Sequence, residues 1–190
     1  MHMAAAPHVW TADDLDRLPE NDGNKYELVD GRLLVTPAPS MAHEAVVNEV
    51  AARLRTYAAR FALGTVFHRN DLKFDENNRV DPDLSVVPVT GPVGDRTWAT
   101  APRPLLVVEV LSRSTRTHDL VWKADLYARE NIPDCWIVDH RERVVHLVQP
   151  ARHGRAAERV TTKLEWRAAG GAEPLVIDLP AFFDAVIGTR

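Results

Sequence analysis

The chain has 190 residues, of which 45% are hydrophobic and 26% are charged, a composition typical of one soluble globular domain that buries a full core. No apolar stretch approaches the roughly 20 residues that span a bilayer, and the first residues show no secretory signal, so we expect a cytoplasmic protein without a membrane segment. The formal net charge of −4 argues against a surface that binds nucleic acid everywhere, but it is compatible with a local basic patch.

The N-terminal part predicts a short helix, a hairpin and a long helix. A capping threonine followed by acids indicates a helix over residues 11–18. Strands over 25–29 and 32–36 flank Asp30-Gly31, a dipeptide that suits the positive φ angles of a two-residue turn. Over residues 40–61, apolar side chains recur at intervals of three and four, which predicts an amphipathic helix that faces the core.

The rest of the chain predicts short strands, two further helices and no internal repeat. Four prolines and two glycines over residues 88–104 indicate an irregular surface loop. Strands are expected near 65–68, 71–74, 80–87, 105–111, 135–139, 143–149 and 161–166, and helices over 120–132 and 180–187.

Acidic residues interrupt two of these apolar strands. Glu109 is the one charged residue of the run 105–111, and a carboxylate in a core strand is costly unless a cation meets it. Strand alternation over 80–87 would place Asp81, Asp83 and Ser85 on one face, where Glu109 is the natural neighbour. Asp83 and Glu109 therefore predict a site for Mg²⁺, with Mn²⁺ as a possible substitute, since hard divalent cations take carboxylate oxygens. The alternative is structural: an interior Glu can pair with Arg or Lys, and Asp before Pro is common in turns.

Lys123 lies four residues after Asp119 on a predicted helix, which leaves two interpretations open. The pair can be an ordinary surface ion pair of the i,i+4 type. In the functional interpretation, the ammonium group lies beside the attacked phosphate and offsets the charge that develops there.

Several other residues are lesser candidates. His43, Tyr127 and Ser112 also have structural explanations, as a helix-terminal polar group, a packing aromatic and a turn residue respectively. Asp139 follows Ile137 and Val138 in the next strand, which would place it near the site. The lone Cys135 excludes an intramolecular disulfide and, in its apolar surroundings, is expected to be buried and unreactive. The arginines and histidines between Arg141 and Arg159 form the richest basic stretch, although such stretches are more often solvated surface.

These motifs occur in an order that resembles the Uma family of "putative restriction endonucleases", within the PD-(D/E)xK nuclease superfamily. The resemblance covers about Tyr26 to Leu147. It rests on Tyr26-Glu27-Leu28-Val29-Asp30-Gly31, Pro37-Ala38-Pro39-Ser40 with His43, Asp81-Pro82-Asp83-Leu84, Val108-Glu109-Val110-Leu111-Ser112 with Ser114-Thr115, and Asp119 to Lys123 to Tyr127.

The resemblance implies an α/β (α+β) restriction-endonuclease-like core, in which a mixed β-sheet is flanked by helices, within a single domain spanning residues 1–190. It implies metal ligands at Asp83 and Glu109, with Glu27 as a third acidic contributor. The superfamily lysine normally stands two residues after the strand glutamate, where this chain has Leu111. The resemblance assigns that role to Lys123 on the following helix.

The predicted function is that of a Mg²⁺-dependent endonuclease that hydrolyses DNA phosphodiester bonds. Two-fold dimers are common among nucleases that cut duplex DNA, so a homodimer is expected. A catalytically silent module that keeps the nuclease fold and binds nucleic acid or protein is the alternative. A hydrolase that uses paired carboxylates without a metal is disfavoured, because the acids occur together with a lysine.

Overall fold

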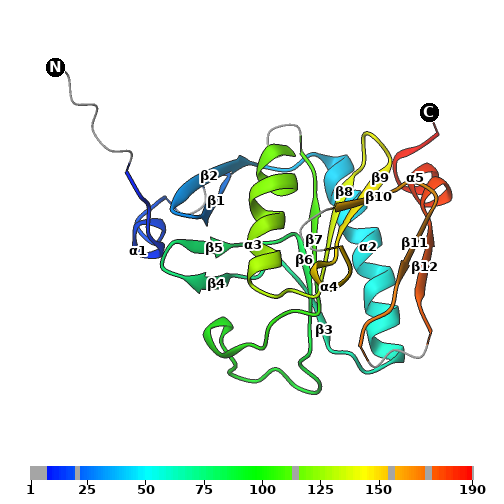
Figure 1. Cartoon of the computed structure of the whole chain (residues 1–190), viewed down its shortest axis with the longest axis horizontal. Coiled ribbons are helices and arrows are strands. Elements are labelled where there is room, and N and C mark those ends of the chain that lie inside the picture. The colour runs from blue at the N-terminus through cyan, green and yellow to red at the C-terminus, as the bar shows by residue number, and fades with distance from the viewer. Residues whose placement is uncertain (1–7, 20–21, 113–115, 154–156, 170–172, 190) are drawn as a thin grey trace.

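A six-stranded mixed sheet forms the centre of the computed structural model, which describes residues 8–19, 22–112, 116–153, 157–169 and 173–189 (Figure 1). Its strand order is β10-β9-β8-β7-β6-β3. Only β7 and β8 are parallel among the neighbouring pairs of this sheet in the described residues, and a helical crossover joins them. The strands are β3 (Thr65–His68), β6 (Leu84–Val87), β7 (Leu106–Val110), β8 (Asp134–Asp139), β9 (Val144–Val148) and β10 (Ala157–Val160).

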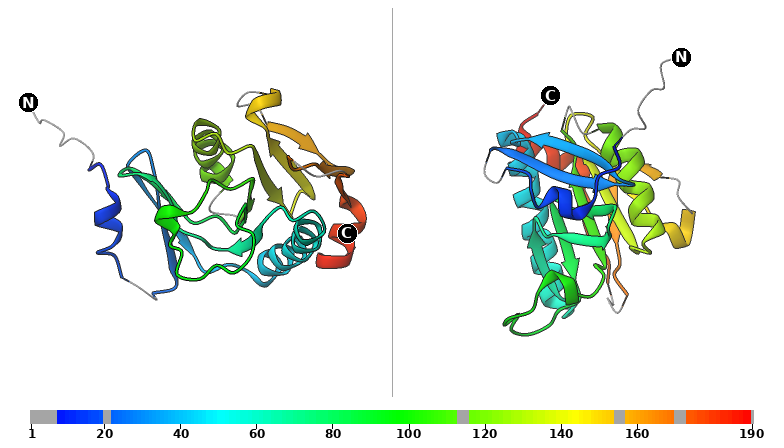
Figure 2. Two further views of the ribbon diagram at one scale, coloured as in Figure 1. Left: turned by 90° about the horizontal axis from the view of Figure 1, so that it is seen from below. Right: turned by 90° about the vertical axis from the view of Figure 1, so that its left-hand side faces the viewer.

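Helices cover both faces of this sheet, as the views in Figure 2 show. On one face lies α2 (Met41–Arg60), which Ser40 caps by accepting a hydrogen bond from the amide of His43. On the other face lies the crossover, which runs through a π-helical segment, η2 (His118–Lys123), into α3 (Ala124–Arg129). Because both faces are covered, β7 and β8 are apolar except at Glu109, Asp134 and Asp139.

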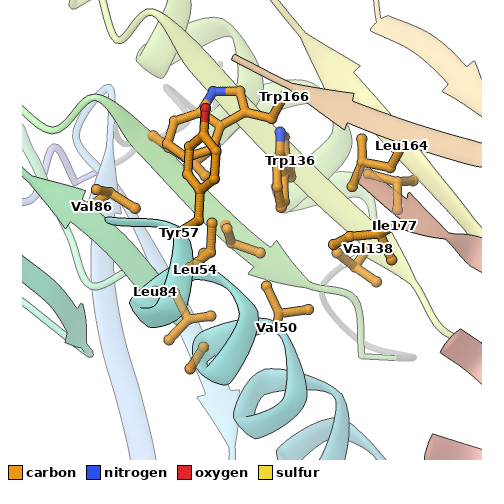
Figure 3. Packing of buried hydrophobic residues seen from close by; sticks show 14 of the residues in the cluster. Val50, Leu54, Tyr57, Leu84, Val86, Trp136, Val138, Leu164, Trp166 and Ile177 are labelled. Atoms are coloured by element: carbon orange, nitrogen blue, oxygen red, sulfur yellow. The ribbon is translucent and has the colours of Figure 1, made fainter. Parts of the chain in front are cut away.

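Three aromatic side chains, Tyr57, Trp136 and Trp166, pack among aliphatic ones in the core on the α2 side (Figure 3). The Tyr57 ring lies 5.4 Å from that of Trp166, and Trp166 lies edge-on to Trp136 at 5.8 Å between centroids. A small hairpin and the last helix close this side of the core. They comprise β11 (Lys163–Trp166), β12 (Leu175–Asp178) and α5 (Leu179–Ile187).

A second sheet, of order β2-β1-β5-β4, lies beside the first (Figure 1). Asp30 and Gly31 connect its central hairpin with φ angles of 51° and 69°, the left-handed backbone that the predicted turn requires. This sheet contributes β1 to the region between the two sheets. The strands are β1 (Asn24–Val29), β2 (Arg32–Pro37), β4 (Leu72–Asp75) and β5 (Asn78–Val80), with the short helix α1 (Ala12–Leu15) at their edge.

The structure confirms the predicted mixed fold and most predicted elements but corrects the strand over 80–87. That segment is two strands in two sheets: β5 ends at Val80 and β6 begins at Leu84. Pro82 cannot donate to a ladder, so the chain leaves one sheet here and enters the other. The first helix is also shorter than expected. The irregular loop contains only the 3₁₀ turn η1 (Trp98–Thr100), and α4 (Pro150–His153) is an unpredicted single turn. Within the described ranges, no helix has both the length and the apolar character needed to cross a membrane.

Gly64, between α2 and β3, is the position where the backbone tolerates a side chain least. Its φ is 139°, and a Cβ there would lie 2.0 Å from the Val87 carbonyl oxygen. We expect Gly64→Ala to lower the free energy of unfolding by about 3 kcal/mol or more, because the clash is with backbone. Gly91→Ala is the matched control, since φ is 79° but no atom lies within 4 Å of the added Cβ. Urea unfolding that gives equal losses for both variants would contradict this expectation.

Candidate active site

A cavity of about 330 Å³ opens where the two sheets, the start of α2 and the π-helical segment meet. The structure brings Asp83, Glu109 and Lys123 together in its wall. Asp119 and Ser112 lie there too. The sequence motifs therefore converge in space although they are far apart along the chain.

Lys123 is buried, with 2% of its side chain exposed, and its ammonium group faces carboxylates from three elements. Its Nζ lies 2.8 Å from Glu27 Oε1, 3.2 Å from Glu109 Oε1 and 3.3 Å from Asp119 Oδ1. Burial alone would lower the pKa of Lys123, but these carboxylates raise it well above its usual value. The surface-pair interpretation is wrong, because the Asp119–Lys123 pair is part of a buried cluster.

Glu109 lies on β7 and uses one oxygen for two bonds. Oε1 accepts a 2.6 Å hydrogen bond from the Tyr127 hydroxyl, in addition to its contact with Lys123. Burial raises the pKa of Glu109 to about 8, although Lys123 and Lys25 act to lower it. Burial and Glu109 also raise the pKa of Tyr127 well above its usual value, so the phenol stays neutral and donates. Both of these bonds fall on Oε1.

Asp83 lies just before β6 and is fixed by a main-chain bond. Its Oδ2 accepts a 2.8 Å hydrogen bond from the amide of Val110 and lies 3.3 Å from His43 Nε2. Burial alone would raise the pKa of Asp83, but the bond from His43 and nearby positive charge lower it to about 2. Likewise, burial would lower the pKa of His43, and Asp83 raises it. His43 is therefore a partner of the site rather than only a residue of the first helical turn.

Register explains why Asp83 and Glu109 meet. In the antiparallel pair β6·β7, Leu84 lies opposite Val108 and Ser85 opposite Val107. Continuing this register by one residue places Asp83 opposite Glu109, where side chains on one face are close neighbours. The sequence predicted that Asp83 and Glu109 are close because side chains would alternate along one strand that includes residues 81–85. In the structure, residues 81–83 are not part of a strand.

Glu27, on β1, belongs to the buried cluster around Lys123. It is 1% exposed and is not among the described residues that line the cavity. Its Oε1 accepts from the Asp81 amide at 2.8 Å and contacts Lys123, while Oε2 lies 3.4 Å from Lys25 Nζ. Burial alone would raise the pKa of Glu27, but the two ammonium groups lower it. Glu27 thus holds the two lysines.

Lys25 is the residue that sequence reasoning missed. It lines the cavity, and its Nζ donates a 2.9 Å hydrogen bond to the Asp81 carbonyl. Burial and Lys123 act to lower the pKa of Lys25, but Glu27 and the other carboxylates raise it. A signal was present, because residues two apart on a strand share a face, so Lys25 accompanies Glu27.

Two other sequence candidates lie elsewhere. Asp139 is buried and paired with Arg116, and it is absent from the described lining of the cavity. Cys135 is in the core on the α3 side, where burial raises the pKa of its thiol well above the usual value. Burial of the thiol confirms the expected structural position of Cys135.

The donor set fits a hard divalent cation held by few protein ligands. Among the described residues, no group of three or more His, Cys, Asp and Glu side chains is arranged to hold a metal ion. Asp83 and Glu109 nevertheless face the cavity with one oxygen each not used by the bonds above. Mg²⁺ commonly binds through one or two carboxylates and completes its shell with water and substrate phosphate, so an all-protein cage is not required.

Comparisons with known proteins identify the family of this chain. Residues 12–178 match the family model Uma2, described as "Putative restriction endonuclease". The chain belongs to the Uma2 family. Among solved structures, a "putative nuclease belonging to DUF820" from Anabaena variabilis shares the Uma2 chain's fold, with a TM-score of 0.73 and 18% identity over 93% of this chain and 99% of that one. A search of curated proteins finds no match.

The buried cluster predicts a large, pH-dependent role for Lys123 in stability. We expect Lys123→Ala to lower the free energy of unfolding by about 3–5 kcal/mol near neutral pH, because the variant leaves buried carboxylates without their cation. Lys123 lowers the folded-state pKa of Glu27, so this stabilisation is present above the unfolded pKa and is lost as pH falls through the folded one. The difference from wild type should therefore shrink in acid.

Urea unfolding near neutral pH and at acidic pH measures this difference. Lys73→Ala is the control, because Lys73 forms an exposed pair with Glu76 at 2.9 Å, and such pairs contribute little. Equal and pH-independent effects of the two substitutions would contradict a stabilising role for the cluster.

Proposed function

We propose that this Uma2 family member is a divalent-metal-dependent endonuclease that hydrolyses DNA phosphodiester bonds. The observation that carries the proposal is the convergence of Asp83, Glu109 and Lys123 on one cavity. A carboxylate pair beside a buried ammonium group suits phosphodiester hydrolysis. In this reaction the nucleophile must approach a negatively charged phosphate, and the additional negative charge of the transition state must be stabilised. Membership of a nuclease family supports the same reaction class.

Asp83 and Glu109 are the proposed ligands of Mg²⁺, with Mn²⁺ as the substitute. A bound cation would supply Lewis-acid polarisation of the phosphate and activation of a water nucleophile. The chain's own residues hold the two carboxylates in place. The Val110 amide ties Asp83 to the residue that follows Glu109, and Tyr127 fixes the orientation of Glu109.

Lys123 has two proposed tasks at this site. Its Nζ holds the carboxyl groups of Glu109 and Asp119 when no substrate is present, at distances of 3.2 and 3.3 Å. Because it also lines the cavity, it adds positive potential where a phosphate would develop charge in the transition state. Glu27 acts through Lys123 and Lys25 and is a positioning residue in this proposal.

The proposal predicts that cleavage and metal binding depend on the same two carboxylates. With Mg²⁺ or Mn²⁺, wild type should cut supercoiled, linear or single-stranded DNA, and EDTA should stop the reaction. Asp83→Asn and Glu109→Gln should each lower the cleavage rate by a factor of 100 or more, because each removes one of the two proposed metal ligands, a loss of about 3 kcal/mol in transition-state stabilisation. Calorimetric titration with Mn²⁺ should show weaker binding in both variants.

Glu49→Gln is the control for this experiment, since Glu49 pairs with Arg53 on the exposed side of α2. Mn²⁺ binding that is unchanged in both site variants would refute the metal assignment. Metal binding without cleavage of any DNA would favour the other function, a silent module in which the same cluster serves only to bind.

A homodimer is part of the same proposal. Cutting both strands of a duplex is achieved most simply by two copies of the cavity related by a two-fold axis. Analytical ultracentrifugation should give a mass of twice the 21.2 kDa chain. A monomer at all concentrations, with and without duplex DNA, would contradict this part.

A further inference from the structure

A second cavity, of about 780 Å³, adjoins the candidate active site. The two cavities share Asn24, Lys25 and Arg69 in their walls. The second extends over the small sheet to Trp98 of η1. A chain-like ligand bound at Asp83 and Glu109 therefore has a path that continues past Lys25 and Arg69.

Arg69 is anchored to the active site through its backbone. Its amide donates to the Asp83 carbonyl at 3.3 Å, and the next residue, Asn70, accepts a 2.6 Å hydrogen bond from the Ser85 hydroxyl. The φ angle of Arg69 is 44°, a left-handed conformation that is unfavourable for a residue with a long side chain.

The side chain of Arg69 is available to an anionic ligand. It is 50% exposed, and it contacts Glu44 at 3.3 Å, an exposed ion pair of the kind that contributes little. A phosphate can replace this carboxylate and accept two hydrogen bonds from the guanidinium group.

Lys25 supplies the second cation at the same junction. Two protein oxygens, the Asp81 carbonyl and Glu27 Oε2, lie within 3.4 Å of its Nζ, and an ammonium group has three hydrogens to donate. Its side chain is 19% exposed, whereas that of Lys123 is 2% exposed and faces three carboxylates. Lys25 is therefore the lysine better placed to meet a phosphate that leaves the first cavity.

The remainder of the second cavity is not a general anion site. Its other cation, Arg79, is balanced by Asp71 and Asp16. The Asp81 carboxyl also lines this cavity and interacts with Lys25 and Arg69, which are the two cations at the junction with the first cavity. At the far wall Trp98 is 37% exposed, and Phe67 holds it edge-on at 4.9 Å between centroids. An indole supported in this way offers a surface on which a nucleobase can stack.

We propose that the second cavity binds one nucleic-acid strand next to the cleaved bond: Lys25 and Arg69 hold the phosphate that adjoins the scissile one, and Trp98 stacks an unpaired base. The substrate class is DNA that is single-stranded on one side of the cut. This inference rests on the proposed function only for the location of the cut, because strand binding itself requires no hydrolysis.

Binding without cleavage tests the path. A fluorescein-labelled single-stranded DNA oligonucleotide is titrated with the full chain in EDTA at several salt concentrations, and anisotropy gives the affinity. Arg69→Ala should weaken binding about tenfold and reduce the slope of log K against log salt by about 0.7, the value for one lost phosphate contact on a single strand. Arg69→Lys should restore part of the affinity. Lys25→Ala should also weaken binding and reduce the salt slope. Arg69→Ala is the primary test, because the exposed side chain of Arg69 can be removed without disturbing the buried cluster.

Trp98 provides an independent readout. Trp98→Ala should weaken binding roughly 5- to 150-fold, the range for one base stack, with no change in the salt slope, while Trp98→Phe should retain most of the affinity. Blunt duplex DNA of the same length should bind more weakly than the single strand and should respond little to Trp98→Ala.

Arg60→Ala is the matched control, since Arg60 is equally cationic but lies about 25 Å from His43 along α2. If Arg69→Ala matches Arg60→Ala in affinity and salt slope, or if Trp98→Ala binds like wild type, the path is wrong. Wild type that cleaves DNA while these variants bind and cleave normally would overturn the path and leave the nuclease assignment standing. Strand binding that depends on Arg69 and Trp98, without metal-dependent cleavage by wild type, would support the path and overturn the hydrolytic function.

Discussion

The candidate site depends on the ion pairs that the ammonium group of Lys123 forms with buried carboxyl groups. It lies in the interior among Glu27, Glu109 and Asp119, which come from β1, β7 and η2. A cation buried in this way is tolerated only because several carboxylates meet it, and each carboxylate is tolerated because of the cation. The cluster therefore joins the small sheet, the central sheet and the crossover helix at one point.

The pairing of β6 with β7 sets the second requirement, the approach of Asp83 to Glu109. Those strands belong to the central sheet, yet Asp83 precedes β6 in the link that arrives from the small sheet. The Val110 amide restrains the Asp83 side chain, because it donates a hydrogen bond directly to Asp83. A backbone hydrogen bond thus ties the Asp83 carboxylate to the residue that follows Glu109.

Part of this arrangement was predictable from sequence, because the signals were local. Glu109 stood out as a charge in an apolar run, and the hairpin and α2 followed from turn chemistry and helical periodicity. The burial of Lys123 was not predictable, since an i,i+4 pair looks alike on a surface helix and inside a cluster. The place of Arg69 depends on how two sheets pack side by side, which no local pattern encodes, whereas Lys25 had a local signal in its position two residues before Glu27. The break at Pro82 could have been weighed more heavily, because proline rarely lies within a central strand.

The π-helical segment His118–Lys123 contains one helical turn that is wider than an α-helical one, and its end carries Lys123. In a regular helix each residue advances by about 100° around the axis. The number of residues in this segment therefore sets the direction in which each later side chain of the helix points. Losing a single residue before Lys123 would preserve helicity and apolar content but turn the ammonium group away from Glu109 and Glu27. Such wide turns often arise at functional positions. The orientation of the Lys123 side chain thus depends on the number of residues before it as much as on the residue type. Homologues with a shorter crossover would need their cation at another helical position.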